Sequence, residues 1–234
     1  GIMACSSELK HSDNISEAVG DSRSVWVHVV RHGEVHNPQK VFYGRLPGFG
    51  LTLQGKTQAA AAGEALKAKE PKPRLVISSP MLRAKETAQA IHEKLELKQQ
   101  ILVEDGVNEV SSPFEGQTLE YMASIGWELY DPEKAMNIEA DLKDHETFEK
   151  MSDRVLKTLH QIVAKALKDQ VNAVVVTTHG DVCVGIRLWA TGNEPTRRAR
   201  SDAIKSGYPG YCCVTSLRFD ADGKLVETDW KSKK

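Results

Sequence analysis

The chain has 234 residues, 40% of them hydrophobic, and its 31 basic and 32 acidic side chains give a formal net charge of −1. This length and composition suit a single domain with a large core. The balanced charge excludes a general attraction for nucleic acid or an anionic membrane surface. No apolar run approaches the roughly 20 residues that span a bilayer, and residues 1–16 lack the apolar stretch of a secretory signal. We therefore expect a cytoplasmic protein with no nucleic-acid partner and no membrane.

The N-terminal segment differs in composition from the rest of the chain. Residues 1–23 are polar and aperiodic, which predicts a disordered arm, and Gly1 and Ile2 before Met3 resemble a cloning remnant. Residues 24–234 are expected to form one domain. The four cysteines have no zinc-binding spacing, and we interpret them as reduced, structural thiols: Cys5, Cys183, Cys212 and Cys213.

The first half of the domain alternates strands and helices. The pattern predicts a strand over residues 25–30, an irregular loop over 37–51, a helix over 52–70 capped by Thr52, and a strand over 74–78. Ser79 then precedes Pro80. Because serine caps helices and proline suits their first position, this pair predicts a helix from Pro80 to about Leu95.

The second half continues the alternation. We predict a short strand over 101–103, helices over 117–130 and 146–168, a strand over 173–178 followed by a helix, and a hairpin of strands 211–219 and 224–230. Residues 196–207 are strongly basic and are interpreted as a solvated loop. The four tryptophans are interpreted as packing residues: Trp26, Trp127, Trp189 and Trp230.

This order of elements predicts an α/β fold, a three-layer α/β/α sandwich with a mostly parallel central sheet. In such folds ligands bind at the carboxyl ends of the strands. Four polar residues fall there: Arg31 and His32 after the first strand, Arg83 in the helix turn after the second, and His179 after the strand 173–178. Guanidinium groups bind oxyanions, and a phosphoryl group suits them best. A metal site would contain carboxylates rather than arginines.

A single histidine or arginine in such a place is more often structural than catalytic. We keep that interpretation for five histidines, although His36 could line the pocket: His28, His36, His92, His145 and His160. For the four residues at the strand ends a purely structural role is a weak explanation, because such residues would have to fall by coincidence at the ends of three different strands.

Four segments together resemble the histidine phosphatase superfamily, also called the phosphoglycerate mutase-like family. They are VVRHGE at 29–34, YGRLPGFGLTLQGKTQA at 43–59, ISSPMLRAKETA at 77–88 and VVTTHGD at 175–181. The ordered set is far more specific than RHG alone. The resemblance implies a phosphoglycerate mutase-like fold and makes 24–234 a catalytic domain.

The resemblance also implies roles for individual residues. His32 matches the histidine that attacks phosphorus and becomes phosphorylated, while Arg31, Arg83 and His179 match the residues that bind the phosphoryl group. The segment GVNEVSSPFEG at 106–116 matches the one that carries the proton donor, which nominates Glu109. Other carboxylates in this part of the chain are fallbacks: Glu104, Asp105 and Glu115.

Two residues on the loop that follows the first strand each have two possible roles. Asn37 lies nearer RHG than the family asparagine does; it could donate to phosphoryl oxygens or, beside Pro38, serve as a turn residue. Arg45 could touch substrate or pair with an acid.

These observations favour a phosphatase that needs no cofactor and no metal and that hydrolyses a phosphorylated small molecule or phosphoprotein. The alternatives are a phosphoglycerate mutase, disfavoured because the long mutase insertion is missing before His179, and a non-catalytic module that binds phosphorylated ligands. The sequence leaves the oligomeric state open.

Overall fold

The computed structural model describes residues 23–134 and 145–230. Nearly all of the predicted N-terminal arm, residues 1–22, lies outside the described residues, as does Cys5. Six strands form one sheet in the order β3-β2-β4-β1-β5-β6. Their bounds are β1 Val25–Arg31, β2 Leu75–Ser78, β3 Leu102–Val103, β4 Ala173–Thr178, β5 Val214–Phe219 and β6 Leu225–Thr228. Strands β1 to β4 are parallel, and β5 runs antiparallel to both β1 and β6.

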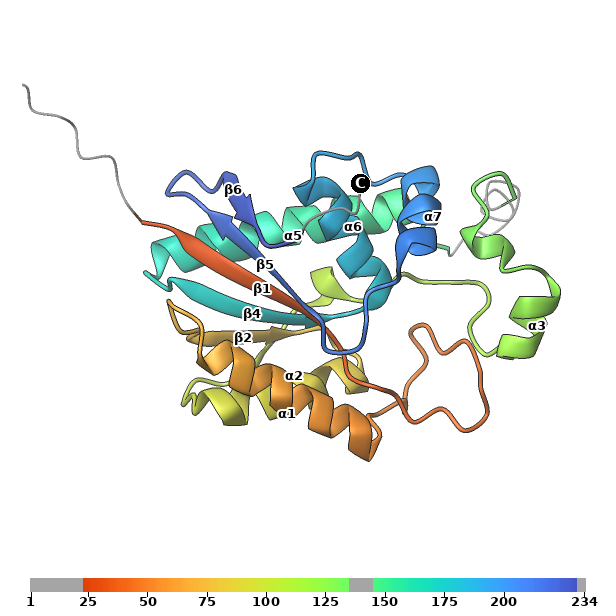
Figure 1. Ribbon diagram of the computed structural model, residues 1–234, viewed down its shortest axis with the longest axis horizontal. Coiled ribbons are helices and arrows are strands. Elements are labelled where there is room, and N and C mark those ends of the chain that lie inside the picture. Colours follow the sequence, from red (N-terminus) through yellow and green to blue (C-terminus); the bar gives the residue numbers. More distant parts are fainter. Residues whose placement is uncertain (1–22, 135–144, 231–234) are drawn as a thin grey trace, which may run out of the picture.

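Helices cover both faces of this sheet (Figure 1). On one face lie α1 (Leu53–Lys67) and α2 (Leu82–Leu95), and on the other lie α5 (Phe148–Lys168) and α6 (Gly180–Ala190). Two smaller helices, α3 (Leu119–Ser124) and α7 (Arg197–Ser206), lie beyond the carboxyl ends of the parallel strands. The predicted three-layer sandwich with a mostly parallel sheet is confirmed.

The central strands have hydrophobic side chains on both faces. In β1, Val25, Val27 and Val29 join the core beneath α5 and α6, whereas Val30 joins the core beneath α1 and α2. Strand β4 divides in the same way, with Val175 on the α1 side. Successive side chains of a strand point to opposite faces, so a nearly continuous valine run is what a sheet covered on both sides requires.

The strand register brings the ends of three strands into line. Arg31 of β1 pairs with Thr178 of β4, and Ser78 of β2 pairs with Thr177. Two further backbone hydrogen bonds extend the ladder past the strands: the N–H of His32 donates to the Thr178 carbonyl at 2.9 Å, and that of Ser79 donates to the Thr177 carbonyl at 3.0 Å. The residues that follow β1, β2 and β4 therefore share one edge.

Two predicted helix boundaries were wrong. Helix α2 begins at Leu82 rather than Pro80, with Met81 as an N-cap that forms no side-chain hydrogen bond. The predicted helix over 117–130 is shorter: α3 ends at Ser124, and a single 3-10 turn, η2 (Glu128–Tyr130), follows. The reason is local, since Gly126 and Trp127 both have positive φ angles, which an α-helix excludes.

The basic segment 196–207 was also predicted wrongly, because it forms helix α7. Thr196 caps this helix by accepting a hydrogen bond from the N–H of Ala199 at 3.2 Å. Arg200 turns inward and is only 2% exposed, with its guanidinium over the ring of Phe148. One side of the segment therefore packs against the protein instead of facing water. Among the helices of the described ranges, none is long and apolar enough to cross a membrane.

Candidate active site

The loop after β1 holds His32 in a fixed, buried orientation. The side chain is 1% exposed, and its Nδ1 lies 2.8 Å from the carbonyl oxygen of Gly33. Because a carbonyl only accepts, Nδ1 carries the proton and Nε2 keeps its lone pair. Burial, together with the positive charges of Arg83 and Arg31, holds the pKa of His32 well below its usual value. A neutral imidazole with a free Nε2 is the form that can act as a nucleophile.

Two glycines allow α1 to begin directly against this loop. A Cβ on Gly33 would lie 2.5 Å from the carbonyl oxygen of Gly55, and one on Gly55 would lie 2.2 Å from that of Glu34. Both distances are shorter than any real Cβ contact. The glycine of the RHG motif is therefore needed for close backbone approach.

His179 stands beside His32 at the end of β4, with 5.5 Å between ring centroids. It is completely buried, and its Nε2 lies 2.6 Å from the hydroxyl oxygen of Ser79. Burial, and after it the charge of Arg83, holds the pKa of His179 well below its usual value. This second imidazole is therefore also neutral. Its Nδ1 lies 3.6 Å from Oε2 of Glu109.

The two predicted arginines approach the same place from different elements. Arg83, in the first turn of α2, is fully buried; its Nη2 donates to the Gly44 carbonyl at 2.7 Å, and its guanidinium lies over the ring of Tyr43 at 4.7 Å. Arg31 donates to the carbonyl of Pro209 and lies beside Tyr208 and Tyr211. The aromatic rings hold both cations without neutralising them.

Three buried nitrogen atoms of this cluster lack a hydrogen-bond partner among the described residues. They are Nε of Arg31, Nε of Arg83 and Nδ1 of His179. A buried polar atom without a partner costs about 1–3 kcal/mol, so native proteins rarely retain one without a reason. An oxyanion that accepts from the two guanidinium groups would satisfy this need.

Glu109 supplies the only carboxylate within 4 Å of Arg83 or His179 in the part of the chain that the structure describes. Burial and the nearby Asp181 carboxylate raise its pKa to about 7, against the lowering effect of Arg83. Its Oε1 accepts from the N–H of Val110 at 3.0 Å. A carboxyl group with such a pKa can hold a proton near neutral pH and release it during a reaction.

Arg45 fixes the backbone that carries Glu109. Its Nε donates to the carbonyl of Glu109 at 2.6 Å, and its Nη2 lies 3.0 Å from Glu146. Arg154 binds the same Glu146 carboxylate at 2.7 Å and donates to the carbonyl of Asn108 at 3.2 Å. Of the two predicted roles for Arg45, contact with substrate or an ion pair with an acid, the structure shows the ion pair with Glu146. This pair lies at the border of the cluster.

Two predicted residues are not brought into the cluster. The Asn37 side chain donates to the Val41 carbonyl at 2.8 Å and accepts from the Val41 N–H at 3.1 Å, so its amide closes a turn. His36 is exposed, and its described hydrogen bond runs from its backbone N–H to Gly50. The structure therefore places both on the outer part of the loop after β1.

Sequence reasoning missed four residues around the cluster. Ser79 was predicted to cap a helix. It directly follows β2, as His32 follows β1 and His179 follows β4, and this position could have indicated a place in the cluster. Asp181 lies in the VVTTHGD motif and accepts from the Tyr208 hydroxyl at 2.9 Å. Nothing in the sequence around Tyr208 or Tyr211 indicated that both rings would flank Arg31. Within 23–134 and 145–230, no group of three or more metal-ligating side chains was found.

The fold is α/β, and its cluster places unpaired guanidinium donors beside a neutral, buried histidine, an arrangement that can bind an oxyanion. A family model described as "Histidine phosphatase superfamily (branch 1)" matches residues 27–230. The chain belongs to this superfamily, which supports activity of the phosphatase or mutase type.

The chain is also similar to a known protein in sequence and to solved structures in fold. "Uncharacterized protein Rv0525" of Mycobacterium tuberculosis is 34% identical over 209 residues, covering 86% of this chain and 93% of the relative. The crystal structure of phosphoglycerate mutase from Bacillus anthracis has a TM-score of 0.70 at 24% identity, covering 88% of this chain and 92% of that one. Mycobacterial glucosyl-3-phosphoglycerate phosphatase Rv2419c has a TM-score of 0.64 at 21% identity, covering 88% and 96%. At these identities the two structures show the fold alone.

Proposed function

We propose that the protein is a metal-independent phosphatase that hydrolyses a phosphomonoester through a phosphohistidine on His32. The observation that carries the proposal is the geometry of the buried cluster: a neutral imidazole with a free Nε2, beside His179 and the unpaired guanidinium donors of Arg31 and Arg83. Those donors suit the equatorial oxygens of a phosphoryl group in transfer.

In the first step the lone pair of His32 Nε2 forms a bond to phosphorus, and the bond from phosphorus to the ester oxygen breaks. The leaving oxygen keeps that electron pair and takes the proton of Glu109. The raised pKa of Glu109, about 7, supports this role, and a bound phosphate dianion would raise it further.

In the second step a water molecule replaces the departed alcohol. Glu109, now a carboxylate, takes a proton from the water. The oxygen of the water bonds to phosphorus, and the bond between phosphorus and Nε2 of His32 breaks. Inorganic phosphate leaves, and His32 returns to the neutral form with its proton on Nδ1. The Gly33 carbonyl 2.8 Å from Nδ1 keeps the ring oriented throughout.

The charge that develops on the phosphoryl oxygens is compensated by the two guanidinium groups, so the proposed chemistry requires no metal ion. Desolvated, preorganised cations are more effective here than they would be in water. Activity should therefore persist in EDTA, and a strict requirement for added divalent cations would contradict this part of the proposal.

The leaving group is proposed to lie on the Glu109 side of the cluster. A hollow of about 610 Å³ adjoins it, and its lining includes Arg45, Asn108, Lys150 and Arg154. This polar lining supports a phosphorylated small molecule with a hydrophilic leaving group. The printed name of one structural neighbour, a glucosyl-3-phosphoglycerate phosphatase, is consistent with that substrate class.

The test is a panel of phosphomonoesters, with both phosphoglycerates included, assayed on the wild type, His32→Ala and His36→Ala. We expect the wild type to release inorganic phosphate, and His32→Ala to lose at least about 10⁴-fold in kcat/KM because the nucleophile is removed. His36→Ala is the matched control, since this histidine is exposed and lies four residues away.

Two results would replace the proposal. Interconversion of the two phosphoglycerates much faster than hydrolysis of either would make the protein a mutase. A folded wild type that binds phosphate but turns over none of the panel would make it a module that binds phosphorylated ligands.

A further inference from the structure

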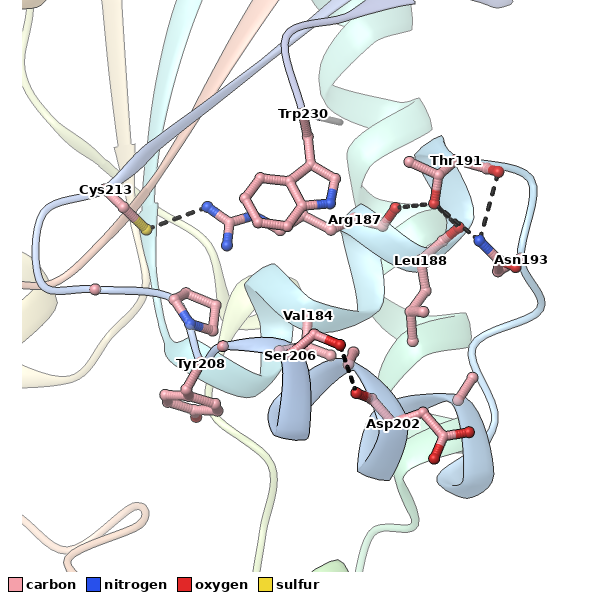
Figure 2. A pocket seen from close by; sticks show the side chains of 15 residues that line it. Val184, Arg187, Leu188, Thr191, Asn193, Asp202, Ser206, Tyr208, Cys213 and Trp230 are labelled. Carbon is pink, nitrogen blue, oxygen red and sulfur yellow. Dashed lines mark hydrogen bonds between the residues drawn. The ribbon is translucent and has the colours of Figure 1, made fainter. Parts of the chain in front are cut away.

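A second cavity lies outside the catalytic cluster, between α6, α7 and the end of the described chain (Figure 2). Its volume is about 550 Å³, within the range of small-molecule sites. Neither His32 nor His179 lines it. Most of its wall is apolar, with Val184 and Leu188 from α6, Ala199 and Ala203 from α7, and Trp230 opposite them.

Arg187 brings a buried positive charge into this apolar wall. Its side chain is 6% exposed, and the indole of Trp230 covers the guanidinium at 3.8 Å. Two of its five N–H groups have described acceptors: Nε donates to the Thr215 hydroxyl at 2.9 Å and Nη2 to the sulfur of Cys213 at 3.3 Å. No carboxylate in the described ranges lies within 4 Å of it.

A buried charge without a counterion is costly, and buried charges in proteins are normally paired. The acid that also lines the cavity does not supply the partner. Asp202 is 63% exposed at the rim, and its carboxylate lies 3.7 Å from Lys205. The cavity therefore offers one cation without a neighbouring carboxylate, on a wall that is mostly apolar.

We propose that this cavity binds a small carboxylate carried on a flat apolar body. The carboxylate would accept from the unused N–H groups of Arg187, and the apolar body would pack between Leu188, Ala203 and Trp230. A guanidinium presents its donors in a fork that matches the two oxygens of a carboxylate. Trp230 lies over the face of this guanidinium, whereas its N–H groups point outward in the plane of the group.

The wall of this cavity is shared with the catalytic cluster. Tyr208 and Pro209 line the cavity, and the same two residues contact Arg31, the proline through its carbonyl and the tyrosine through its ring. A ligand that fixes this segment also fixes the position of Arg31. We therefore expect the carboxylate and inorganic phosphate to alter each other's Kd by the same factor, as linkage requires.

The experiment uses the full chain and two probes, 2-naphthoate and its uncharged amide, titrated by calorimetry with and without saturating inorganic phosphate. We expect 2-naphthoate to bind at one site per chain, roughly tenfold or more tighter than the amide, because it alone forms a charge-assisted bond. Arg187→Gln should remove that difference. Ala203→Phe, which fills the cavity, should weaken both probes.

Arg218→Gln is the matched control, because this arginine forms an exposed ion pair with Glu227 on the neighbouring strands. Ala203→Phe keeps the test decisive if Arg187→Gln fails to fold. Equal affinity for the two probes, binding unaffected by Ala203→Phe, or no binding up to about 1 mM would overturn the proposed site. Binding that appears only when residues 231–234 are removed would show that this segment is the occupant instead. An unchanged Kd in saturating phosphate would overturn the linkage.

Discussion

The candidate active site has two parts that are held in different ways. The sheet edge carries His32, Ser79 and His179, each directly after a parallel strand, and the backbone N–H groups of His32 and Ser79 extend the ladder to β4. The loop wall carries Glu109 and Tyr208, and it is held by side chains such as Arg45 and Arg154, which bind main-chain carbonyls. The edge is therefore set by the fold, whereas the wall depends on a few individual contacts.

Under the proposed function the two parts would have different tasks. The edge, with the arginines beside it, would hold the phosphoryl group, which every phosphomonoester contains. The wall would supply the proton and meet the leaving group, which differs between substrates. Damage to the edge and its arginines should affect all substrates alike, and damage to the wall should depend on the leaving group.

The largest effect among the arginines is expected for Arg83→Gln. Removing one preorganised donor to a developing charge costs about 10²- to 10³-fold, and Arg83 is fully buried with its Nε unpaired. We expect a loss in kcat/KM of that size for every substrate, measured by steady-state kinetics on protein shown to be folded by circular dichroism. Arg218→Gln is the exposed control. A loss below about tenfold, or one confined to some leaving groups, would contradict the assignment of Arg83 to the phosphoryl group.

Glu109→Gln should show the opposite selectivity. For alkyl phosphates, which need a proton on the leaving oxygen, we expect a loss of about 10²-fold, and for p-nitrophenyl phosphate little loss in the first step. The wild-type kcat/KM for alkyl phosphates should fall as the pH rises through about 7, because the raised pKa means that Glu109 loses its proton there. The variant should lack this decline. A uniform loss across leaving groups would place the proton donor elsewhere.

Ser79→Ala should have a smaller effect, about tenfold, because it removes one hydrogen bond worth about 1–1.5 kcal/mol. The lost contact is the one at 2.6 Å to Nε2 of His179, so the phosphoryl site loses orientation rather than charge. The measurement is kcat/KM beside the midpoint of urea unfolding. Ser79→Thr, which keeps a hydroxyl, should restore activity at a similar midpoint. Equal losses in Ser79→Ala and Ser79→Thr would assign Ser79 to packing alone.

The sheet itself provides a prediction that involves stability rather than activity. His28 of β1 is 2% exposed, and burial, followed by the charge of Lys69, lowers its pKa from 6.5 to about 4. Below pH 6.5 the unfolded chain binds a proton here that the folded chain does not bind until about pH 4. The free energy of unfolding therefore decreases as the pH falls from 6.5 to about 4, by about 3 kcal/mol in total.

Urea unfolding of the wild type and His28→Asn at several pH values between 7 and 4 measures this contribution. The variant should show a shallower pH dependence, and His36→Ala, altered at an exposed site, should follow the wild type. Identical pH dependence in His28→Asn and the wild type would mean that His28 is not the titrating group.

The same division explains what the sequence could predict. Valine-rich strands with polar residues directly after them are visible in the sequence, and because parallel strands end at one edge, the meeting of His32 and His179 could be predicted. The turn of Arg200 into the protein could not, because it depends on Asp181 and Phe148, which are distant in the sequence. Ser79 was misassigned because a serine before a proline has a strong local meaning, which the contact with His179 overrides.

The central claim is that the phosphoryl group passes through His32 of the sheet edge. The most direct test is to quench the wild type, His32→Ala and His36→Ala during turnover of a ³²P-labelled substrate and to map the label by peptide mass spectrometry under alkaline conditions. The account predicts an acid-labile, base-stable label on His32 in the wild type and in His36→Ala, and no label in His32→Ala. A label that persists in His32→Ala, or that maps to another residue, would contradict it.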